Sequence, residues 1–247
     1  MPRPRILLVP HFSELDWRIK PLLEEWAQVA SFDAPGVGDE PPPEALTPEA
    51  VVERGVAELD RQGWDRCVVV GDELGAHIAV HLAAAVPARL DALALGHACV
   101  RFRRQGERPT ISPEVLAGMV QMARTDYRSY ARMLTHFSQG AYDDELVDRY
   151  IKRVPGSVAT AYLEALLERQ EGEDLEPALR GLDVPLLLAE HRGCLLFTPE
   201  GYEEAVAAFP EAARASFDLK PSASPEFAET LRSFCHELPA APTGVAR

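Results

Sequence analysis

The stretch "VVVGDELGAH" (residues 68–77) predicts the fold, because an apolar run leads directly into a turn flanked by glycines and then into a helical pattern. Gly71 and Gly75 stand two residues before and two residues after Glu73. They leave room for a sharp turn from strand to helix in strained backbone geometry. Such a turn presents its central residue above the end of a sheet. Because that residue is a glutamate here, the rest of the sequence must indicate what Glu73 does.

Apolar, β-rich runs recur along the chain at residues 6–9, 29–32, 67–70, 92–95, 185–188 and 215–219, and helical patterns lie between them. Strands that are apolar on both faces and alternate with helices are typical of a parallel sheet, since each crossover lays a helix on one face. We therefore predict an α/β protein with a mostly parallel, doubly wound sheet of about six strands.

Strand patterns stop between residues 99 and 182, and helical patterns replace them at residues 112–122, 127–136, 143–153 and 158–170. A long helical insertion in an alternating sheet protein is typical of a lid over the strand ends. The prediction is a core of residues 1–98 and 183–238, a helical lid or cap of residues 99–182, and a disordered tail of residues 239–247.

The composition excludes several classes of partner. The chain has 247 residues, of which 47% are hydrophobic and 26% charged, and its formal net charge is −14 without a long run of Lys or Arg. This balance argues against nucleic acid and against an anionic membrane surface. The apolar run after Met1 is too short for a signal peptide or a membrane span. We expect a cytoplasmic protein, either monomeric or a homodimer, whose partner is a small molecule.

Cysteine usage gives no sign of a metal cluster or a disulfide framework. The four cysteines, Cys67, Cys99, Cys194 and Cys235, are scattered along the chain without a C-x-x-C pair. They are typical of small buried apolar residues. We accordingly expect no cofactor and no metal ion.

In an open parallel sheet, ligands bind beyond the carboxyl ends of the strands. The residues that follow the predicted strands are therefore the candidates for a site. They are residues 10–12, 33–38, 72–74, 97, 190–194 and 218–220.

Several of these segments, taken in order, resemble the α/β-hydrolase superfamily over nearly the whole chain. The matching segments are "LLVPHF" (7–12), "FDAPGVGDE" (32–40), the glycine-flanked turn with its helix, "DVPLLLAEH" (183–191) and "SPEFAETLRSF" (224–234). Their order and spacing together carry the resemblance. It implies a hydrolase fold with a helical lid and a site at the centre of the turn.

The resemblance also implies a catalytic triad whose members are altered here. It implies a serine at the turn, where this chain has Glu73, and an acid a few residues after segment 183–191, where it has Arg192. It implies a histidine shortly before Pro225, but "SFDLKPSA" (216–223) contains none. The backbone N–H groups of Phe12 and Leu74 are still expected to form an oxyanion hole, because such donors do not depend on side chains. A conventional serine hydrolase is therefore disfavoured.

One hypothesis is a hydrolase-type enzyme with Glu73 as a carboxylate nucleophile. Relatives in this superfamily, the epoxide hydrolases and haloalkane dehalogenases, use an aspartate at this turn. Such an enzyme needs a base. His97 is the best-placed candidate, and His11 and His191 lie on the same predicted face.

The alternative is a non-catalytic pseudo-hydrolase that binds a small, largely apolar molecule under the lid or serves as an interaction scaffold. A buried carboxylate needs a cation or a proton, so Glu73 is expected to form a salt bridge with Arg192. Asp218 or Lys220 completes this set of charges at the positions of the altered triad.

A third hypothesis is a metal site made by His11, Glu73, His97 and His191, since imidazoles and a carboxylate are suitable ligands. Their spacing fits no known motif. His77 and His81 also share one helix face at a spacing suited to zinc, but the sequence shows no third ligand, which favours a packing role.

Overall fold

The computed structural model describes residues 3–39, 43, 46–98, 100–101, 112–139, 143–169, 173–194 and 197–239. A six-stranded sheet forms its centre, with the strand order β2-β1-β3-β4-β5-β6 and every neighbouring pair parallel. The strands are β1 (Arg5–Val9), β2 (Gln28–Ser31), β3 (Cys67–Asp72), β4 (Leu90–Gly96), β5 (Leu186–His191) and β6 (Ala213–Phe217). The predicted α/β class and the predicted parallel sheet are confirmed.

Each face of the sheet is covered by its own group of helices. Val69 and Leu93 belong to the apolar cluster that includes α2 (Pro48–Gln62) and α3 (Leu74–Ala85). The alternate residues Val68 and Val70 belong to a second cluster on the opposite face. That cluster includes α1 (Lys20–Glu24) and α10 (Pro225–Glu237). Because successive side chains of a strand point to opposite faces, strands that are apolar throughout produce this doubly wound arrangement.

The strand order reverses between β1 and β3, so the chain leaves these neighbouring strands toward opposite edges of the sheet. Ligands of open α/β sheets bind at the carboxyl ends of strands at such a switch point. The segment after β1 begins at Pro10 and the segment after β3 begins at Glu73. The turn identified in the sequence therefore lies at the favoured position for a site.

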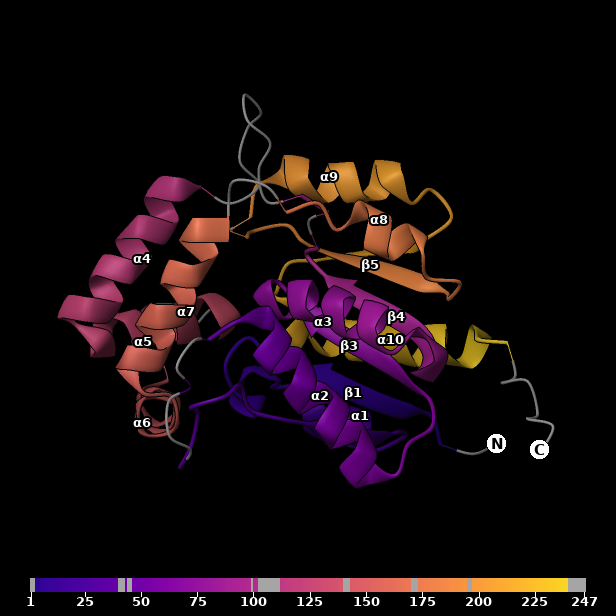
Figure 1. The fold of residues 1–247 in the computed structure, drawn as a ribbon, viewed down its shortest axis with the longest axis horizontal. Helices are drawn as coiled ribbons and strands as arrows, with labels where there is room; N and C mark the ends of the chain where they lie inside the picture. Colours follow the sequence, from indigo (N-terminus) through magenta and orange to yellow (C-terminus); the bar gives the residue numbers. More distant parts are fainter. Residues whose placement is uncertain are drawn as a thin grey trace.

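Helices follow β4 in sequence where the sequence predicts an insertion. They are α4 (Pro113–Thr125), α5 (Tyr127–Gln139), α6 (Asp144–Arg153) and α7 (Gly156–Arg169). These helices pack on one another and lie together on one side of the sheet, at the left in Figure 1. The ring of Tyr162 in α7 meets that of Phe12, which follows β1, at 5.1 Å between centroids. The helical group therefore lies near the carboxyl ends of the strands.

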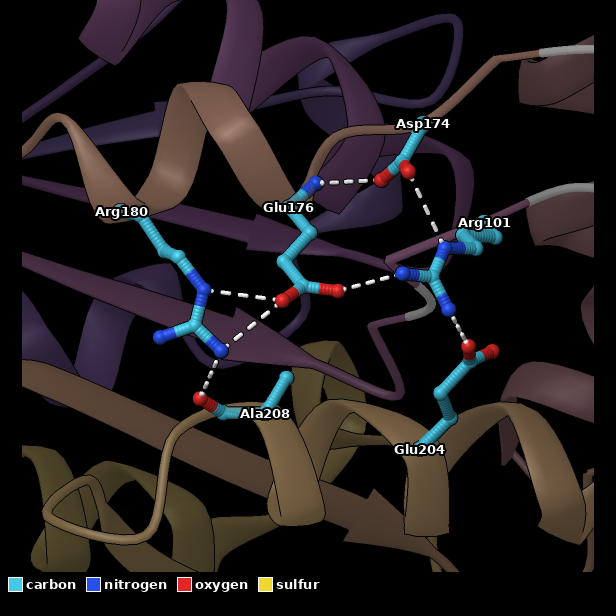
Figure 2. Close-up of polar contacts among 6 residues, drawn as sticks. All are labelled: Arg101, Asp174, Glu176, Arg180, Glu204 and Ala208. Atoms are coloured by element: carbon cyan, nitrogen blue, oxygen red, sulfur yellow. Dashed lines mark hydrogen bonds and ion pairs between the residues drawn. The ribbon is translucent and has the colours of Figure 1, made fainter.

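Arg101 joins the segment before α4 to the segment after α7 and to a further helix. Its guanidinium binds Asp174 and Glu176, at 3.1 and 2.6 Å, and also Glu204 of α9 (Pro199–Ala208) (Figure 2). Glu176 begins α8 (Glu176–Arg180) and also binds Arg180 at 2.8 Å. An antiparallel bridge pairs Arg101 with Asp174 directly. The segments before α4 and after α7 therefore meet at one charged cluster.

Two further predictions concern the C-terminal tail and membrane spans. Residues 240–247 of the predicted tail lie outside the described residues. Among the described helices, none combines the length and the apolar character that a bilayer crossing requires.

Candidate active site

Glu73 lies at the centre of the sharp turn between β3 and α3, and we call residues 71–75 the elbow. Its backbone has φ 51° and ψ −115°, in a region that residues with a side chain rarely occupy. A Cβ on Gly71 would lie 2.4 Å from the carbonyl oxygen of Gly75, and one on Gly75 would lie 2.7 Å from that of Val9. The close approach that the sequence predicts for both glycines is therefore present.

The carboxylate of Glu73 forms a buried ion pair with Lys220. Glu73 Oε2 lies 2.9 Å from Lys220 Nζ, and the side chains are only 12% and 9% exposed. Lys220 comes from the loop that joins β6 to η3 (Pro221–Ala223). Burial is the largest single influence on the Glu73 carboxyl and opposes its ionisation, but the charge and hydrogen bond of Lys220, together with the nearby histidines, hold its pKa below the usual value.

Lys220 stays protonated for the reciprocal reason. Burial alone would lower its pKa, but the carboxylates of Glu73, Asp72 and Asp16 raise it above the usual value for lysine. Asp72 directly precedes Glu73 in the elbow, and its own pKa is raised, first of all by burial. The site is therefore a cluster of one cation among several carboxyl groups, and Lys220 is charged throughout the neutral range.

The predicted salt bridge between Glu73 and Arg192 is wrong. Arg192 follows β5 but binds Asp218, with Nη2 at 2.6 Å from Oδ1, and also donates to Ser216 Oγ at 3.0 Å. The Arg192 and Asp218 side chains are 48% and 83% exposed, so this pair lies at the surface. The physical reason is that β6 is the neighbour of β5 and offers its own acceptors to Arg192, while the next loop turns Lys220 inward.

The backbone N–H of Phe12, which the sequence predicts as an oxyanion donor, already donates a hydrogen bond within the protein. The backbone N–H groups of His11, Phe12 and Ser13 donate to Asp16 Oδ2 at 3.1, 2.9 and 3.0 Å. Successive N–H groups in a turn form a concave site for an anion, and the Asp16 carboxylate fills it. Phe12 therefore does not present a free N–H group, in contrast to the prediction. Leu74 begins α3, where the first backbone N–H groups of a helix lack intrahelical partners.

The position of the Asp16 carboxylate could have been predicted from a short sequence pattern. Ser13 is the N-cap of η1 (Glu14–Asp16), and Ser13 and Asp16 form a capping box in which each side chain accepts a bond from the backbone of the other. The pattern S-x-x-D at residues 13–16 is typical of such a box. That pattern indicates the carboxylate beside the loop after β1.

The three candidate histidines differ in their relation to Glu73. His191 Nδ1 lies 3.9 Å from Glu73 Oε1, which is beyond hydrogen-bond distance. His97 Nδ1 instead accepts a bond of 3.1 Å from the backbone N–H of His191, and burial lowers the pKa of His97. His11 stacks on Phe12 at 4.1 Å, and burial together with the charge of Lys220 lowers its pKa to about 3. Of the three candidate histidines, His191 is therefore the one whose ring nitrogen lies within 4 Å of the Glu73 carboxylate.

The predicted four-residue metal set is not assembled. Among the described residues, the ligand atoms that gather within 4.8 Å of one another at the elbow belong to Glu73, His191 and Cys194. Cys194 Sγ lies 3.5 Å from Glu73 Oε1. Since Lys220 already carries a positive charge against the same carboxylate, this group disfavours a further cation.

A second group of ligand atoms lies one helical turn from the elbow. His77 and His81 of α3 both meet Glu173, which precedes α8, at 2.8 and 2.7 Å. Their spacing in the sequence points to no third ligand, because Glu173 is distant along the chain. Contact between α3 and α8 brings it to them.

Sequence comparison gives one set of curated relatives, and no protein-family profile matches the chain. Over 173 residues the chain is 31% identical to the pimeloyl-(acyl-carrier protein) methyl ester esterase of Klebsiella pneumoniae strain 342. The alignment covers 68% of this chain and 66% of that esterase, slightly under two thirds of its length.

Solved structures share the fold over almost the whole chain. The enol-lactonase from Burkholderia xenovorans LB400 superposes with a TM-score of 0.69 at 22% identity, covering 96% of this chain and 93% of the lactonase. An esterase from Exiguobacterium antarcticum gives a TM-score of 0.74 at 15% identity, covering 95% and 92% of the two chains. At these identities the likeness establishes the fold, which agrees with the resemblance found in the sequence.

Proposed function

The chain belongs to the α/β-hydrolase superfamily, and from this premise we propose that it is a non-catalytic member that binds a small, largely apolar molecule between the elbow and the helical insertion. The observation that carries the proposal is the buried contact of 2.9 Å between Glu73 and Lys220. The resemblance implies a nucleophile at the position of Glu73 and a base in the segment 216–223, which contains Lys220.

The ion pair opposes catalysis by Glu73 in two ways. A nucleophilic carboxylate must leave its cation to reach a carbon atom, and breaking a buried pair costs about 3–5 kcal/mol. Since about 1.4 kcal/mol is a factor of ten in rate, this cost corresponds to roughly two to four powers of ten. Lys220 in turn holds its proton too firmly to act as a general base near neutral pH.

The segment after β1 supports the same conclusion for ester chemistry. Hydrolysis of an ester requires N–H donors aimed at the oxygen that becomes negative in the transition state. Asp16 Oδ2 already accepts from Phe12 N–H at 2.9 Å. A substrate oxyanion would have to displace a carboxylate that three backbone donors hold.

The surroundings favour an apolar ligand. Tyr162 of α7 meets the rings of both Phe12 and His11, at 5.1 and 5.9 Å between centroids. His11 is neutral at neutral pH because its pKa is lowered to about 3. Aromatic and neutral side chains from the core and the insertion therefore meet beside the buried charges. Predominantly apolar sites with a few fixed polar groups are typical of small-molecule binding.

A second candidate is an enzyme that uses Glu73 as nucleophile and His191 as the base for water. The distance of 3.9 Å between His191 Nδ1 and Glu73 Oε1 favours it, because one water molecule or a small displacement would connect them. The elbow geometry, with φ 51° at Glu73, is also compatible with a nucleophile. In this mechanism a Glu73 oxygen attacks the substrate carbon and displaces its leaving group, a halide or the epoxide oxygen, to form an ester. Water deprotonated by His191 then attacks the carbonyl carbon of that ester, which releases the alcohol and restores the Glu73 carboxylate.

Turnover in ¹⁸O-labelled water separates the two candidates. Wild type, Glu73→Gln and a control, Glu190→Gln, are incubated with epoxides, haloalkanes and small carboxylic esters. The control removes a carboxylate of β5 that binds Ser216 and lies outside the ion pair. We expect no turnover above the buffer blank and no isotope in the peptide that contains Glu73. Turnover lost only in Glu73→Gln, with label incorporated at Glu73, would establish the enzyme instead.

A further inference from the structure

Two histidines of the elbow helix face a single carboxylate. His77 and His81 lie four residues apart on α3, which places them on the same helix face, and their rings are 4.9 Å apart between centroids. Glu173, in the segment leading into α8, faces both. The site described above uses none of these side chains.

The three side chains bring their ligand atoms together. His77 Nε2 lies 2.8 Å from Glu173 Oε2, and His81 Nε2 lies 2.7 Å from Oε1. These nitrogen and oxygen atoms all lie within 4.8 Å of one another. His77 is 3% exposed, whereas Glu173 and His81 are 21% and 28% exposed, so the group is buried on one side and open to solvent on the other.

We propose that His77, His81 and Glu173 bind a divalent transition-metal ion of the zinc class, with solvent as the fourth ligand. Two imidazole nitrogens and one carboxylate oxygen are a ligand set that zinc takes in tetrahedral sites. Zn–N and Zn–O distances of about 2.0–2.2 Å place tetrahedral ligand atoms roughly 3.3 Å apart. The observed 2.7 and 2.8 Å must therefore open by about half an ångström as the metal replaces the shared protons.

The position of the site suggests what the metal does. His77 lies one turn along α3 from Glu73, and its backbone N–H donates to the Glu73 carbonyl at 3.4 Å. Glu173 immediately precedes Asp174, one of the residues that Arg101 binds. A metal ion here joins the elbow helix to the end of the helical insertion. The proposed metal site does not depend on whether Glu73 is catalytic.

The test is a metal titration of the full chain, freed of purification histidines and stripped with a chelator. Co²⁺ binding is followed by its visible absorption and Zn²⁺ binding by calorimetry. We expect one equivalent of either ion. His81→Ala and Glu173→Gln each remove one ligand from a partly exposed position, and circular dichroism checks their fold. Each substitution should weaken metal binding by more than roughly 10- to 100-fold, which is the loss caused by removing a residue that only hydrogen-bonds to a metal ligand.

The control is Cys194→Ser, which removes a ligand atom from the group at Glu73 and lies outside the group of His77, His81 and Glu173. It should bind both ions as tightly as wild type. The proposal is overturned if wild type binds neither ion stoichiometrically at micromolar concentration. It is equally overturned if His81→Ala and Glu173→Gln each still bind the ions as tightly as wild type. Loss of metal binding in Cys194→Ser would also overturn it.

Discussion

Asp72 Oδ2 accepts a hydrogen bond of 2.9 Å from the backbone N–H of Ser222. Asp72 directly precedes Glu73 in the elbow and Ser222 follows Lys220 by two residues, so this bond fixes the loop that carries Lys220 to Glu73. Asp72 and Ser222 are 3% and 1% exposed. The ion pair at the elbow therefore depends on a second buried contact between the same two segments.

Replacing Asp72 should loosen this loop. Asp72→Ala removes the acceptor and leaves the Ser222 N–H buried without it, which costs about 1–3 kcal/mol of the free energy of unfolding. Asp72→Asn keeps an oxygen at the same place and should cost less. Urea unfolding of both variants measures the difference. Equal destabilisation by Ala and Asn would show that the hydrogen bond does not hold the loop.

The close approach at the elbow predicts intolerance of a single methyl group. Gly75→Ala places a Cβ 2.7 Å from the Val9 carbonyl oxygen, and backbone of a central strand yields little. We expect a loss of about 1–3 kcal/mol or more in the free energy of unfolding. The matched control is Gly118→Ala in α4, where a Cβ would meet nothing within 4 Å. This substitution should raise the free energy of unfolding by up to about 1 kcal/mol, because alanine favours a helix more than glycine does. Similar values for both variants in urea unfolding would contradict the geometry.

The charged cluster at Arg101 predicts how the insertion is held. Arg101→Met leaves Asp174, Glu176 and Glu204 facing one another without their shared cation. We expect faster proteolysis near the ends of the insertion and a loss of about 1–3 kcal/mol. Arg128→Met breaks an exposed pair with Asp148 and should change stability by no more than about 0.5 kcal/mol. Equal effects would show that the Arg101 cluster contributes no more than an ordinary surface pair.

His11 predicts a loss of stability in acid. Its pKa falls from 6.5 to about 3 in the folded protein, so between these values the unfolded chain binds a proton that the folded chain does not. Stability therefore decreases as pH falls through this window, by about 1.4 kcal/mol per pH unit for this group. In urea unfolding at several pH values, His11→Gln should lose less stability than wild type from pH 6.5 downward. Parallel pH profiles would contradict the burial of a neutral His11.

The sequence predicts the sheet well because its signals are local. Each strand is an apolar run, and Gly71 and Gly75 predict the elbow. The partner of Glu73 is not a local property. Arg192 and Lys220 both follow strands, and only the pairing of β5 with β6 gives Arg192 its own acceptors in Ser216 and Asp218.

Glu173 was missed for a similar reason. It reaches His77 and His81 through the packing of α8 on α3, which no sequence spacing encodes. Asp16 differs, since the capping box at residues 13–16 could have indicated that a carboxylate lies against the loop after β1.

A double-mutant cycle on the Glu73–Lys220 ion pair, measured by urea unfolding, tests most directly whether these two buried charges neutralise each other. Glu73→Gln takes from Lys220 the carboxylate that it contacts, and Lys220→Met takes from Glu73 its cation, so each should destabilise by about 3–5 kcal/mol. The double variant should lose far less than the sum, giving a coupling well above the roughly 1 kcal/mol of an exposed pair. Additivity within about 0.5 kcal/mol would contradict the account, because it would mean that Lys220 does not neutralise Glu73 in the folded protein.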